Sequence, residues 1–125
     1  MGGKNSKGPL NVLGTQLQTC NLNPATGYLR DGKCGWHPED SGSHLVCGIV
    51  NDEFLRFTQS RGNDLITPRR NFPGLVHGEK WCLCVFRWLE AYKYNPKIAP
   101  RVVAATTNAE VLRYVPYEVL RPYFV

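Results

Sequence analysis

Two cysteines one residue apart, Cys82 and Cys84, lie between Trp81 and Trp88 in the stretch KWCLCVFRW. In a strand their Cβ atoms would share a face about 7 Å apart, and in a helix they would point about 200° apart. Neither geometry suits a disulfide between them. We therefore predict that both are core thiols packed against the tryptophans, because free cysteine behaves as a small buried hydrophobe.

A second group of sulfur and nitrogen donors consists of Cys34, His37, His44 and Cys47. Cysteines and histidines in two closely spaced pairs are typical ligands of a structural zinc site, provided that the chain turns so that all four side chains converge. The chain has five cysteines, and an odd number argues against a complete disulfide framework. We predict that the cysteines are reduced, that these four residues hold no metal, and that no cofactor is bound.

A catalytic hypothesis uses Asp40, His44 and Cys47, which follow one another at the entry of a predicted buried strand. A histidine beside a thiol, oriented by a carboxylate, forms the activated pair of a thiol enzyme. However, His44 and Cys47 are an odd number of residues apart and should face opposite sides of a strand, so a direct pair needs a bulge. The favoured alternative is that His44 belongs to a turn and Cys47 to the core.

A broader hypothesis adds the polar residues Asn63, Asp64 and Thr67 of a long connection, and Arg87 of a later helix. Polar side chains beside a buried strand must either form hydrogen bonds with backbone groups or face a bound ligand. We expect Asp40, His44, Asn63 and Asp64 to face a common cleft of a small-molecule binding or catalytic domain. Asn63 and Asp64 could instead serve as turn residues after Gly62.

The alternative function is a non-catalytic interaction module tethered to a membrane through its N-terminus. The first residues match Met-Gly-x-x-x-Ser, with Gly2 and Ser6 in place, which is a myristoylation signal in a eukaryotic cell. One acyl chain binds membranes only marginally, so Lys4 and Lys7 would have to add electrostatic attraction.

Length and composition indicate one globular domain. The chain has 125 residues, of which 42% are hydrophobic and 20% charged. We expect a disordered arm over residues 1–9 and one domain over 10–125. No apolar run reaches the roughly 20 residues of a membrane span, and no secretory stretch begins the chain, which favours a soluble cytoplasmic protein, peripheral to a membrane if acylated. The net charge is +5, but bases and acids are interleaved, so we expect no nucleic-acid partner. The oligomeric state is left open.

Local patterns predict an α+β fold with an early β-hairpin, mixed strands, two to four short helices and a long ordered loop. Residues 11–20 suit a strand, and Asp31-Gly32 is the signal of a hairpin turn that would place Cys20 and Cys34 on early strands. Residues 44–50 are dense in β-branched side chains and suit a buried strand. Asn51 then caps a helix that Gly62 stops, with Phe54, Leu55, Phe57 and Thr58 on its buried face.

The second half begins with a connection over residues 62–80 whose hydrophobic Leu65, Ile66, Phe72 and Leu75 should pack down. Residues 81–94 predict a largely buried helix, although the first four could be a strand. Residues 101–107 suit a strand, Asn108 can cap a short helix to Tyr114, and Pro116 begins the last one.

Several stretches together resemble the domain-of-unknown-function family 2237, whose members are small and uncharacterised. The matching stretches are NVLGTQLQTC, TGYLRDGKC, ED-G-H-VC within residues 39–47, DEFLRF, GNDLITP, FPGL and WCLC-RW-EA. They span nearly the whole chain beyond the arm. The resemblance implies membership and no particular activity. His37 stands where the family pattern has no histidine, and Asn108 stands where it has one.

Overall fold

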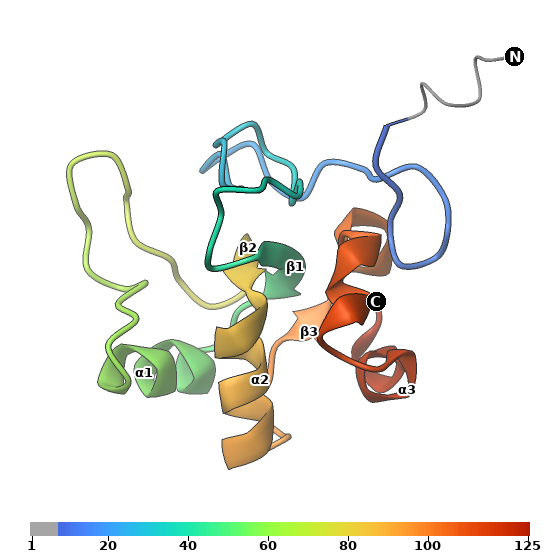
Figure 1. The fold of residues 1–125 in the computed structure, drawn as a ribbon. Helices are drawn as coiled ribbons and strands as arrows, with labels where there is room; N and C mark the ends of the chain where they lie inside the picture. Colours follow the sequence, from blue (N-terminus) through green and yellow to red (C-terminus); the bar gives the residue numbers. More distant parts are fainter. Residues whose placement is uncertain (1–7) are drawn as a thin grey trace, which may run out of the picture.

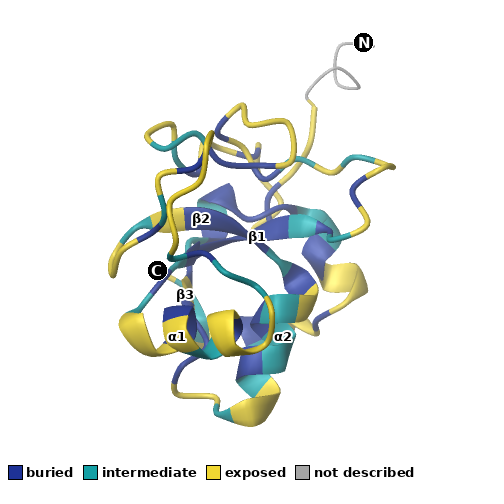
Figure 2. Ribbon diagram, turned by 90° about the vertical axis from the view of Figure 1, so that its left-hand side faces the viewer, coloured by how far each residue is buried: buried dark blue, intermediate teal, exposed yellow. Residues whose placement is uncertain are grey.

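The computed structural model describes residues 8–125, which fold around a three-stranded antiparallel sheet of order β2-β1-β3. The acylation motif at Gly2 and most of the predicted arm lie outside the described residues. Helices α1 and α2 lie on one side of the sheet, and the irregular N-terminal segment lies on the other (Figures 1 and 2). The strands and α-helices are β1 (His44–Ile49), α1 (Asp52–Ser60), β2 (Lys80–Cys84), α2 (Val85–Tyr94), β3 (Arg101–Val102) and α3 (Tyr117–Leu120).

The predicted α+β class is confirmed, and α1 follows the local signals closely. The Asn51 side chain accepts a hydrogen bond from the Phe54 amide, and acidic residues occupy the first turn. Phe54, Leu55 and Thr58 are buried as predicted, whereas Phe57 is half-buried. The helix ends at Ser60, and Gly62 follows with a positive φ of 93°.

Pairing with β1 decides the conformation of WCLC. Residues Lys80–Cys84 form β2, in which Cys82 lies opposite Cys47 and Leu83 opposite Val46, and α2 begins only at Val85. The prediction of helix from residue 81 was therefore wrong, and the alternative of a short strand is correct. Periodicity alone does not separate the two for so short an apolar run.

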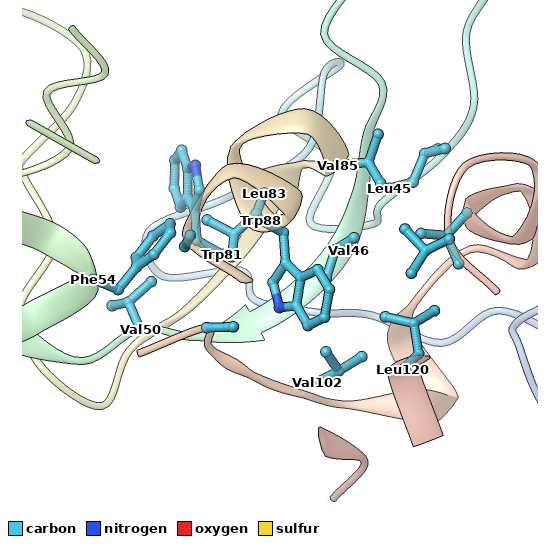
Figure 3. Close-up of a cluster of buried hydrophobic side chains, with 14 of the residues drawn as sticks. Leu45, Val46, Val50, Phe54, Trp81, Leu83, Val85, Trp88, Val102 and Leu120 are labelled. Carbon is cyan, nitrogen blue, oxygen red and sulfur yellow. The ribbon is translucent and has the colours of Figure 1, made fainter. Parts of the chain in front are cut away.

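The main hydrophobic core fills the space between the sheet and its helices (Figure 3). Its largest fully buried side chain is Trp88 of α2, whose indole N–H donates to the Pro100 carbonyl at 3.0 Å. Tyr92 and Tyr123 pack against the same indole, with ring centroids 5.5 and 5.1 Å away. Trp88 thus connects α2 to the C-terminal segment.

The N-terminal segment does not form the predicted strands. Between residues 8 and 43 only isolated bridges occur, such as Leu10 with Gln16. Asn11 is fully buried, and its side-chain oxygen accepts from the amides of Leu13 and Thr15, which closes a tight loop in place of a strand.

The predicted hairpin at Asp31-Gly32 was also wrong. Asp31 accepts a hydrogen bond from the Lys33 amide and Gly32 has a φ of 89°, so the chain bends at these residues. The flanking runs do not pair as a ladder, because the Gly32 backbone bonds to Cys20 and Thr26 instead. Cys20 and Cys34 are consequently held on irregular backbone.

The C-terminal segment is mostly 3₁₀-helix. The predicted strand over residues 101–107 is reduced to β3, because the hydroxyls of Thr106 and Thr107 both donate to the Val103 carbonyl and turn the chain. Asn108 caps the next segment through the Glu110 amide, as predicted. The 3₁₀ segments are η2 (Ala104–Thr106), η3 (Ala109–Arg113) and η4 (Arg121–Tyr123). Within residues 8–125, no helix combines the length and apolar character that a bilayer span requires.

Candidate functional site

A cleft of about 370 Å³ opens where the 27–30 loop, the start of β1, the 62–79 loop and β2 meet. Leu65 and Phe72 of the long loop are buried, as is Leu75 farther along it, so the predicted packing of this loop onto the core is confirmed. The cleft has no carboxylate in its lining. The lining residues are Gly27, Tyr28, Arg30, His44, Leu65, Arg69, Phe72, Trp81 and Cys82.

Two guanidinium groups in this lining each lie over an aromatic ring. Arg30 lies 5.1 Å from the Trp81 ring centroid, and Arg69 lies 5.1 Å from that of Phe72. The two rings contact each other edge to face at 5.1 Å. The result is a continuous row of Arg30, Trp81, Phe72 and Arg69 that joins two loops distant in sequence. Such stacking restricts where each guanidinium can lie.

His44 and Asp40, both predicted site residues, form a hydrogen-bonded pair. The Nδ1 atom of His44 lies 2.8 Å from Oδ1 of Asp40, whose side chain is only 3% exposed. Asp40 also accepts from the amides of Gly42 and His44, which fixes the carboxylate. Because a carboxylate accepts, Nδ1 carries the proton, and Nε2 has no hydrogen-bond partner within residues 8–125.

Gly42 makes room for the imidazole. A Cβ atom at this position would lie 2.6 Å from Cε1 of His44. Any larger residue would therefore push the ring out of its place beside Asp40.

Of the four residues expected to face a common cleft, His44 lines this one, whereas Asp40, Asn63 and Asp64 do not. Asn63 donates from its side chain to the Thr58 hydroxyl, and Asp64 accepts from the amides of Ile66 and Thr67. Asp64 also lies beside Arg69, with Oδ2 at 4.0 Å from Nη1. Asn63 and Asp64 thus have the turn role that the sequence left as the alternative, and Asp64 lies beside Arg69 of the lining.

The hydrogen bonds to Asp64 predict an acid-sensitive loop. The Thr67 hydroxyl, followed by the amides of Thr67 and Ile66, lowers the pKa of Asp64 from 3.8 to about 2. Because this folded pKa is below the ordinary value, ionised Asp64 stabilises the fold above pH 3.8, and the contribution is lost as the pH falls toward 2. We expect Asp64→Asn to be less stable than wild type at neutral pH, with the difference shrinking between pH 4 and 2. Urea unfolding of both proteins across this range measures it, and a difference independent of pH would contradict the assignment.

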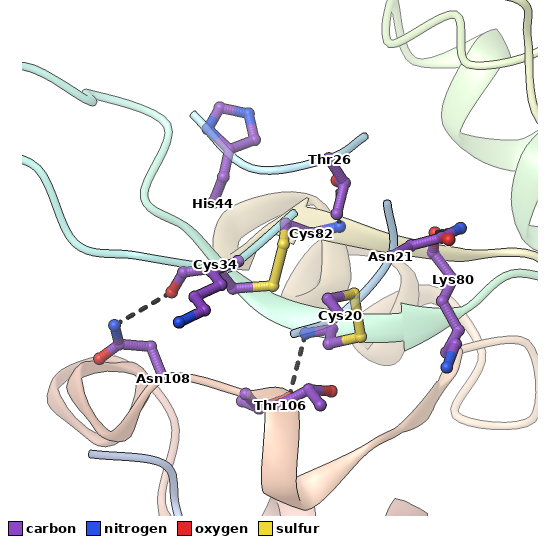
Figure 4. The surroundings of a disulfide bond; sticks show 12 residues. Cys20, Asn21, Thr26, Cys34, His44, Lys80, Cys82, Thr106 and Asn108 are labelled. Carbon is purple, nitrogen blue, oxygen red and sulfur yellow. Dashed lines mark hydrogen bonds between the residues drawn. A yellow bond between two sulfur atoms is a disulfide. The ribbon is translucent and has the colours of Figure 1, made fainter. Parts of the chain in front are cut away.

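Four of the five cysteines form two disulfides, so the prediction of reduced cysteines was wrong for this structure. Cys20 bonds to Cys47 and Cys34 to Cys82, joining the N-terminal segment to the sheet (Figure 4). The fifth cysteine, Cys84, is a free thiol, and its side chain is half-buried. The cytoplasmic location stays a prediction.

Cys47 cannot act as the thiol of a His44–Cys47 pair in this state. It is fully buried and its sulfur is bonded to Cys20. Cys82 is buried as predicted, but as a disulfide partner of Cys34.

The two histidines of the zinc hypothesis are engaged elsewhere. Nδ1 of His37 accepts from the Glu39 amide, and its ring lies 5.1 Å from that of Tyr28. Nδ1 of His44 is directed to Asp40.

Arg87 lies on α2, where it donates to the Arg61 carbonyl and to Glu90. It does not line the cleft.

Residues 10–124 match a family described as an uncharacterized protein conserved in bacteria, the domain of unknown function 2237. The chain belongs to this family. No curated protein matches it. Within this DUF2237 domain, Asn108 has a structural role, because it is buried and donates from its side chain to the Cys34 carbonyl at 3.0 Å.

Sequence reasoning missed Arg30, Arg69 and the two rings beneath them as site residues of this DUF2237 domain. Arg30 was part of the supposed hairpin, whereas it adopts a positive φ of 57°. The adjacent pair Arg69-Arg70 was a visible charge signal, but only Arg69 lines the cleft. No spacing in the sequence relates Arg30 to Arg69.

Proposed function

We propose that this domain binds a small anionic molecule, a carboxylate or a phosphate, in the cleft beside His44. The observation that carries the proposal is the row in which Arg30 and Arg69 are held over Trp81 and Phe72, in a lining without a carboxylate. The cleft volume is at the low end for ligand sites, which favours a molecule of metabolite size.

Arginine is suited to binding such an anion because its planar guanidinium group can donate two parallel hydrogen bonds to a carboxylate or a phosphate. None of the ion pairs within residues 8–125 uses Arg30. Arg69 donates to the Asp64 carbonyl through Nη2 at 2.9 Å, and its Nη1 lies 4.0 Å from Oδ2 of Asp64. This second distance is too long for a hydrogen bond, which leaves Nη1 for a ligand. Stacking on the rings holds both groups before binding, so less conformational entropy is lost when the anion arrives.

His44 gives the site an acid–base group. Asp40 orients the ring through Nδ1, and the Nε2 atom is the one that can exchange a proton with a bound molecule. A binding site with this group could act catalytically on its ligand, in which case Asp40 is a positioning residue.

The test uses inorganic phosphate and succinate as probes, with binding followed by amide chemical shifts of the labelled full-length protein. We expect shifts at Gly27, Arg30, His44 and Arg69. Arg30→Gln and Arg69→Gln should each weaken binding about tenfold or more, because each removes a charge-assisted hydrogen-bond donor.

Arg70→Gln is the matched control, because Arg70 is the exposed neighbour of Arg69 and does not line the cleft. It should bind as wild type does. His44→Gln should lose affinity while keeping near-normal stability in urea, since the His44 side chain is 38% exposed. Failure of both probes to bind at millimolar concentration, or equal losses in Arg69→Gln and Arg70→Gln, would contradict the proposal.

The interaction module tethered through an acylated Gly2 stays a second hypothesis. It requires a eukaryotic transferase, whereas the matched family is described as conserved in bacteria. Unchanged partition between membrane and cytosol after Gly2→Ala would remove it.

A further inference from the structure

We propose that, when its cysteines are reduced, this domain holds one zinc ion through Cys20, Cys34, Cys47 and Cys82. These four residues form a buried cluster of their own, separate from the main core, and each is at most 2% exposed. This ligand set contains no histidine and shares only Cys34 and Cys47 with the set considered from sequence.

The positions of the sulfur atoms carry the proposal. The Sγ atoms of Cys20, Cys34 and Cys47 all lie within 4.8 Å of one another. The sulfur of Cys82 lies outside this group of three but is bonded to that of Cys34. In a tetrahedral zinc–thiolate site, a Zn–S bond of about 2.3 Å places the sulfurs about 3.8 Å apart. Reduction lets each bonded pair of sulfurs separate toward this spacing, and a shift of the Cys82 sulfur toward the other three completes a four-thiolate site.

The backbone around the cluster is already fixed by contacts that do not involve sulfur. Amides of Cys47 and Cys82 donate to the hydroxyls of Thr107 and Thr26, and Asn108 donates to the Cys34 carbonyl. Cys47 and Cys82 also lie opposite each other on β1 and β2. The Cys20 amide donates to the Gly32 carbonyl. The four ligands would thus remain in place after the S–S bonds are broken.

The chemistry balances with a dithiol as reductant. Each disulfide takes up two electrons and two protons from one dithiol, which becomes a cyclic disulfide, so two equivalents give four thiols. Zinc then displaces the four thiol protons and is held by four thiolates, the ligands that suit it best among those present. Zinc and the two disulfides are thus alternative cross-links of the same four segments, one for reducing and one for oxidising conditions.

The experiment begins with full-length protein reduced in denaturant and refolded without oxygen, with or without zinc. Native mass spectrometry should find one zinc per chain, and replacement by cobalt should give the absorption of a tetrahedral thiolate site. Alkylation should then modify Cys84 alone in the zinc form and all five cysteines after chelation. This protection pattern needs no variant.

Variants locate the ligands. Cys20→Ser, Cys34→Ser, Cys47→Ser and Cys82→Ser should each lose the cobalt spectrum or bind the ion at least a hundredfold more weakly. Cys84→Ser is the matched control and should keep both the spectrum and the stoichiometry. The proposal is overturned if the reduced wild type takes up no zinc, if it stays unfolded with zinc added, or if all five cysteines of the zinc form are alkylated.

Discussion

Replacing Cys34 and Cys82 together by alanine is expected to lower the free energy of unfolding of the oxidised protein by about 4 kcal/mol. This bond joins residues 48 apart in the sequence, and removing it releases a long loop of the unfolded chain. The Cys20–Cys47 bond spans 27 residues, and the same chain-entropy relation gives about 3.6 kcal/mol for it. Either loss is a large part of the stability of an ordinary domain.

Equilibrium unfolding in urea measures this loss in a Cys84→Ala background, which prevents thiol exchange. The Cys84→Ala change alone should shift the free energy of unfolding by about 0.5 kcal/mol or less, because Cys84 is unpaired and half-buried. If the Cys34/Cys82 pair loses no more than this control, the disulfide does not stabilise the fold as the structure implies.

Trp88→Ala should lower the free energy of unfolding by about 3 to 5 kcal/mol, the range for truncating a large buried aromatic residue. Trp88 is fully buried between the sheet, Tyr92 and Tyr123, so no neighbour can fill the space at low cost. Trp88→Phe keeps most of the volume but removes the donor to the Pro100 carbonyl, and a loss of about 1 to 3 kcal/mol is expected.

Phe86→Ala provides the comparison on the same helix, because Phe86 is 46% exposed. The Phe86→Ala change should lower the free energy of unfolding by about 1 kcal/mol. Urea unfolding should therefore order the variants as Trp88→Ala, Trp88→Phe and Phe86→Ala, from the largest loss to the smallest. A Phe86→Ala loss equal to that of Trp88→Ala would contradict the placement of the core.

Half of the proposed site could be predicted from the sequence and half could not. Asp40 and His44 are four residues apart at the entry of β1, so local geometry alone can bring them together. Arg30 and Arg69 line the same cleft only because the 27–30 loop packs Arg30 over Trp81, and the 62–79 loop packs Phe72, with Arg69 over it, against the same indole ring. That convergence depends on contacts between segments far apart in the chain.

The sequence by itself determined β1, the capped helix α1, the packed long loop, the Asn108-capped η3 and the start of α3 after Pro116. Each depends on neighbours within a few residues, namely the Asn51 and Asn108 caps, the burial pattern of residues 44–50 and the breaks at Gly62 and Pro116. Only the tertiary structure decided that WCLC is a strand, that residues 8–43 have no regular sheet, and which cysteines pair. These outcomes depend on which distant segment supplies a hydrogen-bond or sulfur partner, and local propensity carries no information about partners 27 or 48 residues away.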